Sequence, residues 1–392
     1  MNYLPRLIET KLTEHLAQER SILLLGPRQT GKTTLIKRIP ADFHLSFIQP
    51  RVRQAYEQDP SRLADELAVL PRLNNGRLPL IIIDEVQKVP EIMDVVQDLI
   101  DNKIAKFILT GSSARKLRRG KAINLLPGRV IVMHLDPLSM PEIASPISLE
   151  NILMNGSLPA VIQTQDASYI QELLISYVST YLEEEVRQEA LVRNLSHFSR
   201  FLTLAASESG NIVNYTKLSQ QIGVAHSTIS GYYQILEDCL IAERIDPLVR
   251  SKTRKKLSKS SKYLFFDMGV RRLAASEGLD PPLDYKGHLF EQFVGLEIIR
   301  ALRTVPVRMK LQYWRDPDGP EVDWVIDTTQ GLIPIEVKWT DNPQEQDAKH
   351  LKVFLEEYQA PKGYVICRTP RRRKLLDNVE AIPWQELSEI IR

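Results

Sequence analysis

Residues 21–34 read SILLLGPRQTGKTT, and this stretch is the most informative about the fold of the amino-terminal part of the chain. It begins with an apolar run of strand length, and the pattern G-x-x-x-x-G-K-[ST] follows at residues 26–33. In such a loop the backbone amides face phosphate oxygens, the lysine reaches the terminal phosphates, and the next hydroxyl can ligate Mg²⁺. The stretch therefore predicts a strand, a phosphate-binding loop and a helix that bind ATP with Mg²⁺.

The nucleotide-binding residues predicted from this loop are Gly26, Pro27, Arg28, Gln29, Thr30, Gly31, Lys32, Thr33 and Thr34. A second apolar run, Leu80–Ile83, delivers Asp84 and Glu85 at the end of a strand, where parallel sheets bind ligands. Asp84 is expected to hold the magnesium, and Glu85 to polarise the attacking water. The alternative is an acidic strand end that caps the next helix. A third strand ends at Thr110 and Ser112, either of which could contact the γ-phosphate.

The 392-residue chain has room for roughly two to four domains, and three compositional regimes divide it. Short β-rich runs alternate with helical periods in the first, which predicts a parallel sheet covered by helices. The second has apolar residues at helical spacing, and the third returns to an α/β pattern. We therefore predict an α/β protein with a nucleotide-binding domain at 1–145, a helical extension at 146–195, a winged-helix-like domain at 196–284 and a second α/β domain at 285–392.

Composition restricts the partners and the compartment. The net charge is +2, from 51 basic and 49 acidic residues, so nucleic acid would have to be bound by local basic patches. Cys239 and Cys367 are too few for a zinc site or a disulfide framework. No apolar run approaches the roughly 20 residues that a membrane span needs, and the amino terminus lacks a secretory pattern. We expect a cytoplasmic protein without a membrane partner.

The phosphate-binding loop, the IDEVQ run at 83–87, the LTGSS run at 109–113 and the Gly128-Arg129 step resemble an AAA+ ATPase. Nearly the whole chain resembles a prokaryotic family in which such an ATPase is fused to a carboxyl-terminal domain with a restriction-endonuclease-like core. The resemblance implies catalytic roles for Lys32, Asp84 and Glu85, with Thr33 and Asp84 at the metal. It also implies that Arg129 is an arginine finger presented to a neighbour in a homo-oligomer such as a ring; the alternative is a surface arginine at a strand start.

Residues 218–236 have the spacing of a helix-turn-helix, with a glycine at the turn and a second helix starting near His226. We expect its outward residues to be His226, Ser227, Thr228, Ser230, Tyr233 and Gln234. After an expected wing strand at Leu240–Ile245 comes a basic run of Arg250, Lys252, Arg254, Lys255, Lys256, Lys259 and Lys262. A second basic cluster comprises Arg115, Lys116, Arg118, Arg119 and Lys121. These features favour DNA backbone contacts, the alternatives being a protein-binding spacer and a solvated helix face.

The segments Glu321–Ile326 and Ile333–Lys338 read as a hairpin, and a bulge or register shift could bring Asp323 beside Glu336 and Lys338. Two carboxylates and a lysine suit metal-assisted phosphodiester hydrolysis, and Glu291 could supply a third acid. The set resembles the PD-(D/E)xK nuclease core, although here Asp323 does not directly follow the proline. The alternative is a retained fold that binds DNA or assembles without cleaving.

The function predicted from these features is a magnesium-dependent ATPase that binds DNA and couples hydrolysis to remodelling of branched or single-stranded structures. One alternative is an ATP-regulated nuclease, in which the carboxyl-terminal site cuts and the ATPase gates access. The other is a nucleotide-dependent protein-interaction switch without DNA activity. Glu85 argues against the switch, because binding ATP does not require a carboxylate at that position.

Overall fold

The computed structural model describes residues 3–69, 77–113, 126–144, 146–182, 195–249, 260–307, 309–316 and 319–391. By its internal contacts the chain forms two compact units, each with its own sheet. Unit 1 comprises Met1–Leu138, Leu158–Gln163 and Gln234–Ile241. Unit 2 comprises Ser139–Ser157, Thr164–Tyr233 and Ala242–Arg392.

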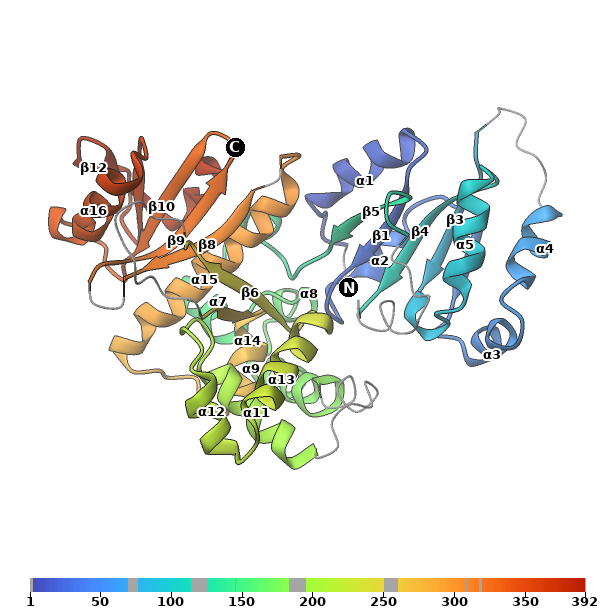
Figure 1. The fold of residues 1–392 in the computed structure, drawn as a ribbon, viewed down its shortest axis with the longest axis horizontal. Coiled ribbons are helices and arrows are strands. Elements are labelled where there is room, and N and C mark those ends of the chain that lie inside the picture. The colour runs from blue at the N-terminus through green and yellow to red at the C-terminus, as the bar shows by residue number, and fades with distance from the viewer. Residues whose placement is uncertain are drawn as a thin grey trace. The chain divides into compact units, whose positions relative to one another are not determined.

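Unit 1 is built on a five-stranded sheet with the order β2-β3-β4-β1-β5, in which all neighbouring strands are parallel (Figure 1). The strands are β1 (Ser21–Leu25), β2 (Phe43–Ser46), β3 (Leu80–Asp84), β4 (Lys106–Gly111) and β5 (Val130–His134). Every residue of β1, β3 and β4 is buried, as expected for central strands with helices on both faces. Because β4 lies between β1 and β3, the carboxyl ends of these three strands are neighbours.

Alternate residues of the central strands contact different helices, so each face of the sheet has its own core. Leu23, Ile81 and Leu109 pack with residues of α3, α4 and α5. Ile22, Ile82 and Ile108 pack with residues of α1 and α2 on the other face. The helices of unit 1 are α1 (Ile8–Ala17), α2 (Lys32–Ile36), α3 (Pro50–Gln58), α4 (Arg62–Ala68), α5 (Ile92–Asp101) and α8 (Pro159–Ile162), with a 3₁₀ turn η1 (Val86–Lys88).

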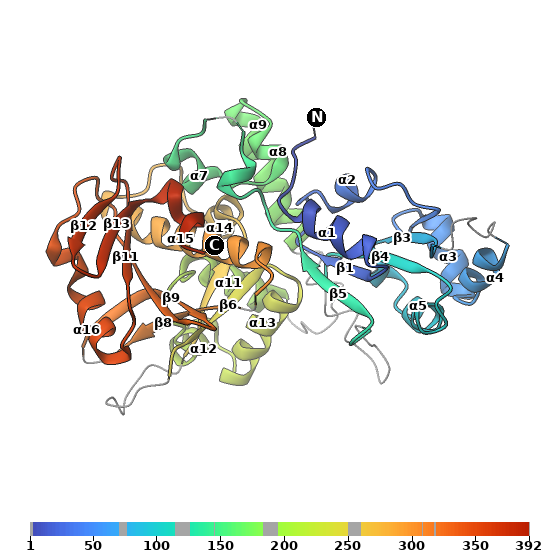
Figure 2. The same cartoon turned by 90° about the horizontal axis from the view of Figure 1, so that it is seen from above.

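Unit 2 is built on an eight-stranded mixed sheet with the order β12-β13-β11-β10-β9-β8-β6-β7 (Figure 2). Its strands are β6 (Ala242–Pro247), β7 (Lys262–Phe265), β8 (Lys310–Arg315), β9 (Glu321–Thr328), β10 (Gly331–Val337), β11 (Gly363–Cys367), β12 (Arg373–Leu376) and β13 (Val379–Pro383). Residues of α15 pack with Trp324 and Ile326 on one face of the sheet. Residues of α16 pack with Val322 and Val325 on the other face.

The helices of unit 2 come from the middle and the end of the chain. They are α7 (Leu149–Asn155), α9 (Ala167–Ser176), α11 (Leu195–Ser207), α12 (Tyr215–Ile222), α14 (Met268–Ala274), α15 (Leu283–Thr304) and α16 (Lys349–Tyr358). A π-helix spans Tyr177–Leu182, and 3₁₀ helices span Met140–Glu142, Glu345–Ala348 and Trp384–Ile390. Helix α13 (His226–Asp238) follows α12 after a turn at Gly223, whose φ of 82° closes α12 in the left-handed conformation that glycine favours.

The structure departs from the sequence-based expectations in two respects. The wing strand begins at Ala242 and pairs with both β7 and β8, so the middle segment contributes two strands to the carboxyl-terminal sheet. The carboxyl-terminal sheet also contains β12 and β13, which follow the hairpin that the sequence predicted. The mixed α/β fold with a parallel amino-terminal sheet agrees with the prediction.

Candidate functional site

The phosphate-binding loop lies between β1 and α2 in unit 1 and has the backbone that the motif requires. A Cβ atom at Gly26 would lie 2.3 Å from the carbonyl oxygen of Leu135, so only glycine fits there. Gly31 has a φ of 99°. The buried Lys32 donates from Nζ to the carbonyl oxygens of Gly26 at 2.7 Å and Pro27 at 2.8 Å, so its ammonium group is held inside the loop.

The acidic end of β3 meets the loop through two hydroxyl groups. Thr33 Oγ1 donates to Asp84 Oδ2 at 2.9 Å, and Thr110 Oγ1 at the end of β4 donates to Asp84 Oδ1 at 2.5 Å. The side chains of Asp84 and Thr110 are fully buried. The strand order explains this meeting, because β4 lies between β1 and β3 and delivers Thr110 to the same edge. A hydroxyl and a carboxylate, both hard oxygen ligands, therefore fit a Mg²⁺ ion whose remaining ligands are waters and phosphates.

Glu85 follows in a left-handed conformation with a φ of 59°. Its backbone amide donates to Thr110 Oγ1 at 3.0 Å, which ties it to β4. Gln87 Nε2 donates to Glu85 Oε2 at 2.5 Å and to Ser112 Oγ at 3.0 Å. Gln87 was missed by the sequence reasoning, although it lies in the IDEVQ run, and together with Ser112 it contacts the carboxylate of Glu85.

A cavity of about 200 Å³ opens beside the loop within unit 1. Its walls combine Tyr3, Leu4, Arg6, Thr30, Gly31, Thr34, Arg38, Leu138, Pro159 and Gln163. The guanidinium group of Arg6 donates to the carbonyl oxygens of Thr30 at 2.8 Å and Asp136 at 2.7 Å, so the segment before α1 is held against the loop. The guanidinium carbon of Arg38 lies 4.1 Å from the Tyr3 ring centroid. No sequence motif indicated these residues except those of the loop itself.

Arg129 lies at the amino-terminal ends of the strands of the same sheet, away from the carboxyl ends that carry the loop. It precedes β5, whose Val130 pairs with Ser21 at the start of β1, whereas the phosphate-binding loop follows the end of β1. Arg129 Nε forms an ion pair with Asp101 Oδ1 at 2.7 Å, and this bond holds the pKa of Asp101 below its usual value. The structure therefore separates Arg129 from the loop of its own chain.

The predicted DNA-contact residues are described only in part. Ser227 is exposed and Thr228 is half-buried at the start of α13. The prediction that Tyr233 faces outward is wrong: it is 1% exposed, and its ring stacks on Tyr263 at a centroid distance of 4.2 Å and meets Phe201 edge-on at 4.9 Å. The remaining basic residues, Arg115, Lys116, Arg118, Arg119, Lys121, Arg250, Lys252, Arg254, Lys255, Lys256 and Lys259, lie outside the described residues.

The carboxylate cluster of unit 2 is brought together by the β9–β10 hairpin and by α15. The antiparallel register of β9 and β10 runs without a shift as far as the pair Ile335 and Trp324, and Glu336 and Asp323 are the next residues of the two strands. Asp323 Oδ2 accepts the backbone amide of Val337 at 2.7 Å, and Lys338 Nζ donates to Glu336 Oε1 at 2.6 Å. The structure thus assembles the predicted set.

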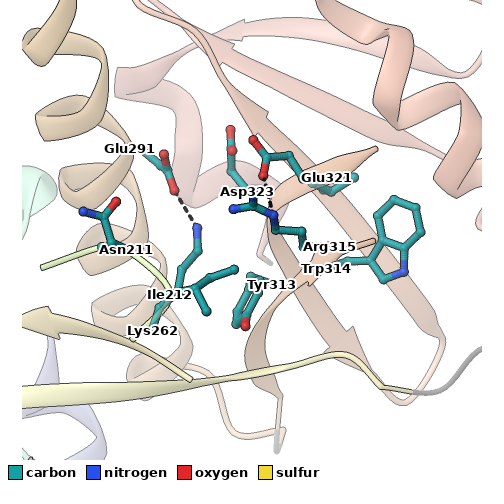
Figure 3. A pocket seen from close by; sticks show the side chains of 11 residues that line it. Asn211, Ile212, Lys262, Glu291, Tyr313, Trp314, Arg315, Glu321 and Asp323 are labelled. Carbon is teal, nitrogen blue, oxygen red and sulfur yellow. Dashed lines mark hydrogen bonds and ion pairs between the residues drawn. The ribbon is translucent and has the colours of Figure 1, made fainter. Parts of the chain in front are cut away.

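One residue was expected elsewhere. Lys262, counted with the basic wing, is 11% exposed, and its Nζ forms an ion pair with Glu291 Oε1 at 2.8 Å (Figure 3). It begins β7, the edge strand of the sheet, and its side chain reaches Glu291 of α15. Since the pairing of β7 with β6 is a long-range feature, a count of basic residues could not place Lys262.

The electrostatics of the cluster follow from burial and crowding. Burial, together with the carboxylates of Glu336 and Glu291, raises the pKa of Asp323 well above its usual value. Burial also raises the pKa of Glu336 to about 7, although Lys338 opposes this shift. For Lys262, burial favours a lower pKa, but Glu291 and Asp323 outweigh it and the pKa is raised. The acidic neighbours therefore favour the charged form of Lys262, whereas burial and crowding favour the protonated forms of Asp323 and Glu336.

Comparisons with known proteins assign the amino-terminal part. Residues 18–144, which hold the loop and the acidic strand end, match a family model described as an AAA domain. Residues 18–144, called the AAA-type domain below, are similar to this family. The P-loop prediction is thereby confirmed for this part of the chain. The region after the AAA-type domain matches two families described as domains of unknown function, DUF8612 at 147–281 and DUF4143 at 286–387.

The similar proteins extend beyond the AAA-type domain. An uncharacterized protein of Mycobacterium tuberculosis is 26% identical over 371 residues, covering 93% of this chain and 80% of that protein. One of Methanocaldococcus jannaschii is 22% identical over 426 residues, covering 97% and 87%. The solved Cdc6p structure of Pyrobaculum aerophilum is 16% identical, covers 70% of this chain and 94% of its own, and has a TM-score of 0.27. Within the described residues, no helix combines the length and apolar character needed to cross a membrane.

Proposed function

We propose that this protein is a magnesium-dependent ATPase that binds DNA and uses ATP hydrolysis to remodel it. The observation that carries the ATPase proposal is the meeting of Thr33, Asp84 and Thr110 at one edge of the AAA-type domain, beside Glu85. The match of residues 18–144 to the AAA-domain family model supports nucleotide binding. The proposals of ATP hydrolysis and of a DNA partner are argued from the residues of this chain.

The roles follow from position. Lys32 and the loop amides bind the phosphates, and Thr33 and Asp84 would hold Mg²⁺. When bound, this ion neutralises charge that develops on the phosphates and orients them. Glu85 accepts a proton from the attacking water, held for this by Gln87 and Ser112. The cavity lined by Tyr3, Arg6 and Gln163 is placed to accommodate the nucleoside, since it adjoins Gly31 and Thr34 of the loop.

The ATPase proposal is tested by comparing Lys32→Ala with Lys37→Ala. Lys32 is buried inside the loop, whereas Lys37 ends the same helix and is exposed. We expect Lys32→Ala to abolish steady-state phosphate release and Lys37→Ala to leave it unchanged. Hydrolysis by Lys32→Ala at the wild-type rate would remove the basis of the proposal.

The DNA partner is proposed from unit 2. The short turn at Gly223 and the exposed polar start of α13 form a helix-turn-helix arrangement that suits phosphate contacts. The basic residues that follow in the sequence favour backbone binding. ATPase rates should be measured with single-stranded, duplex and four-way-junction DNA, and the strands from the same samples analysed for cleavage.

Two substitutions that each introduce a negative charge sharpen the DNA test. Ser227→Asp places a negative charge at the start of α13, and Ser199→Asp places the same charge on the exposed face of α11. We expect Ser227→Asp to weaken DNA binding several-fold in fluorescence anisotropy, with little effect of Ser199→Asp. Equal affinities for both variants would argue against α13 as the contact. No stimulation of ATPase by any DNA would favour the protein-interaction switch.

A further inference from the structure

The carboxylate cluster of unit 2 contains a second ammonium group, that of Lys262, in addition to the Lys338 of the predicted nuclease set. Lys262 reaches it from β7, and its Nζ lies 4.9 Å from the Trp324 ring centroid and 5.2 Å from that of Tyr313. Trp324 Nε1 in turn donates to the carbonyl oxygen of Glu291 at 3.1 Å. The lysine, the ring and the helix that carries Glu291 therefore form one connected arrangement.

Lys262 faces a small cavity that is lined by charged side chains. This cavity of about 110 Å³ is lined by three carboxylates, Glu291, Glu321 and Asp323, and by the cations Lys262 and Arg315 (Figure 3). Lys262 pairs with Glu291 at 2.8 Å, and Arg315 lies 3.5 Å from Glu321. Each acid of the wall other than Asp323 thus has a cationic partner from the chain, and Asp323 accepts a backbone amide.

These contacts do not fit a resident metal ion. A divalent ion needs several oxygen ligands around one point at about 2.0–2.6 Å. In the part of the chain that the structure describes, and with Lys262 in place, no group of three or more His, Cys, Asp or Glu side chains has such an arrangement. The Lys262 ammonium group lies 2.8 Å from Glu291 Oε1, so a metal ion bound to this oxygen would lie beside it. The positive charges of the metal ion and the ammonium group would repel strongly in a buried site.

We propose that Lys262 is the resident cation of this cluster, and that its ammonium group replaces the divalent metal ion for which the carboxylates of Glu291 and Asp323 would otherwise be ligands. The chain therefore neutralises the cluster internally, and unit 2 does not bind a divalent metal there. Removing the ammonium group leaves the carboxylates free to bind one. The inference concerns unit 2 alone and does not depend on the proposed ATPase.

The test measures Mn²⁺ binding to the full-length, nucleotide-free protein by electron paramagnetic resonance. All samples carry Asp84→Asn, so that the metal site proposed in the AAA-type domain does not contribute. Lys262→Met removes the charge while keeping an aliphatic chain. The matched control is Lys310→Met, because Lys310 forms an exposed ion pair with Asp246 at 2.9 Å on the same sheet.

We expect the parent and Lys310→Met to bind no Mn²⁺ that depends on Asp323, and Lys262→Met to gain a Mn²⁺ site that is lost again when Asp323→Asn is added. A folded Lys262→Met protein that gains no site would overturn the proposal. If Lys262→Met does not fold, the parent and the Asp323→Asn variant decide: Mn²⁺ bound by the parent and lost with Asp323→Asn overturns the proposal, and its absence from both supports it.

Discussion

Thr33 Oγ1 and Asp84 Oδ2 are 2.9 Å apart although the two residues are separated by 51 positions in the chain. The hydroxyl comes from the helix after the phosphate-binding loop, and the carboxylate from the end of a strand that does not neighbour β1. A metal ion placed between these oxygens would connect the loop to the acidic strand end. Substitutions at this pair therefore test the proposed magnesium site most directly.

Thr33→Val should lower ATP turnover by at least about a hundredfold, because metal stabilisation of transition-state charge is worth several kcal/mol. Thr33→Ser is the matched control, since it keeps the hydroxyl and should retain most of the activity. Phosphate release across a magnesium titration measures both. Equal rates for the valine and serine variants would exclude Thr33 as a metal ligand.

Glu85→Gln should lower turnover by about 10²- to 10⁴-fold while leaving ATP binding intact, because a general base contributes only after the nucleotide is bound. The control is Glu91→Gln, which changes an exposed glutamate just before α5. Binding of a fluorescent ATP analogue and phosphate release should be measured on the same samples. Loss of binding in Glu85→Gln would instead assign the carboxylate a structural role.

Arg129 lies at the opposite end of the strands from the loop of its own chain, so a role in hydrolysis requires the loop of a neighbouring subunit. Arg129→Ala and Lys32→Ala should each be inactive alone, and mixing them should restore part of the ATPase rate, since a mixed interface combines an intact loop with an intact arginine. Asp101→Ala removes only the ion-pair partner at 2.7 Å and should remain active. Full activity of Arg129→Ala would show that Arg129 is a surface arginine without a role in hydrolysis.

Gly295→Ala should destabilise unit 2 by about 1–3 kcal/mol, because overpacking a buried contact forces neighbouring side chains to move. A Cβ atom there would lie 2.7 Å from Trp324 and 2.8 Å from Leu264. Gly287→Ala, in the same helix, would meet its nearest atom at 3.8 Å and should stabilise the helix by up to about 1 kcal/mol. Urea unfolding followed by tryptophan fluorescence compares the two. Similar effects would contradict the close packing at Gly295.

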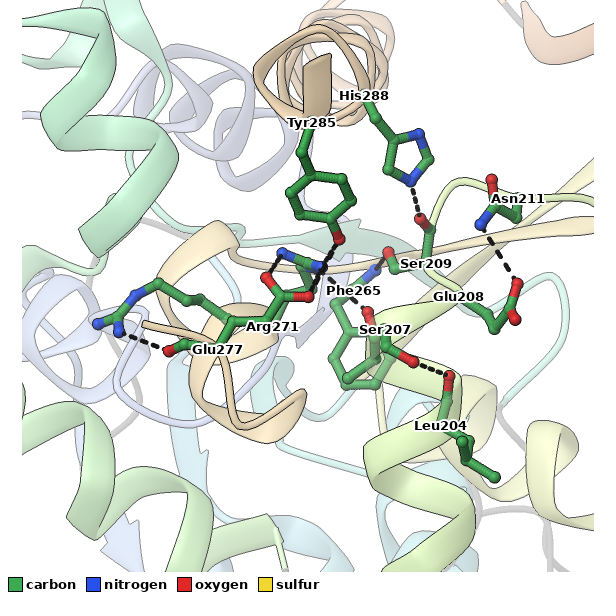
Figure 4. A network of polar contacts seen from close by, with 12 residues as sticks. Leu204, Ser207, Glu208, Ser209, Asn211, Phe265, Arg271, Glu277, Tyr285 and His288 are labelled. Atoms are coloured by element: carbon green, nitrogen blue, oxygen red, sulfur yellow. Dashed lines mark hydrogen bonds and ion pairs between the residues drawn. The ribbon is translucent and has the colours of Figure 1, made fainter. Parts of the chain in front are cut away.

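Stability of unit 2 should fall as the pH is lowered below about 6.5, the ordinary pKa of histidine. His288 lies in a polar network with Ser209, whose carbonyl oxygen is 2.9 Å from Nε2 (Figure 4). Burial lowers the pKa of His288 in spite of the opposing charge of Glu291. The unfolded chain therefore binds the proton more readily, with a slope of at most about 1.4 kcal/mol per pH unit for one proton.

The matched variant for this pH test is His288→Gln, which can still donate to the Ser209 carbonyl oxygen but does not titrate near neutrality. Its unfolding free energy should depend less on pH between 5 and 7.5 than that of the wild-type protein, as measured by urea unfolding at each pH. Parallel pH profiles would mean that other groups cause the loss of stability.

Local motifs allowed the sequence to indicate the AAA-type domain and its phosphate-binding loop. The loop needs glycines, a lysine and a hydroxyl at fixed offsets along a few consecutive residues, so its geometry follows from the local backbone. Asp84 and Glu85 could be recognised for the same reason, because an apolar strand ends directly before them. The mixed α/β character also followed from periodicity.

Tertiary structure alone decided the residues that support these groups. Arg6 bonds to the carbonyl oxygen of Asp136, 130 positions away, and no spacing rule connects them. Tyr233 was expected to face outward, but three aromatic neighbours bury it, because the exposed face of a helix depends on what packs against it. Lys262 belonged to a basic run in the sequence and to a carboxylate cluster in the fold. Strand order, and not proximity in the sequence, determines which charged side chains become buried beside one another. A lysine that would be solvated on the surface can therefore form a buried ion pair.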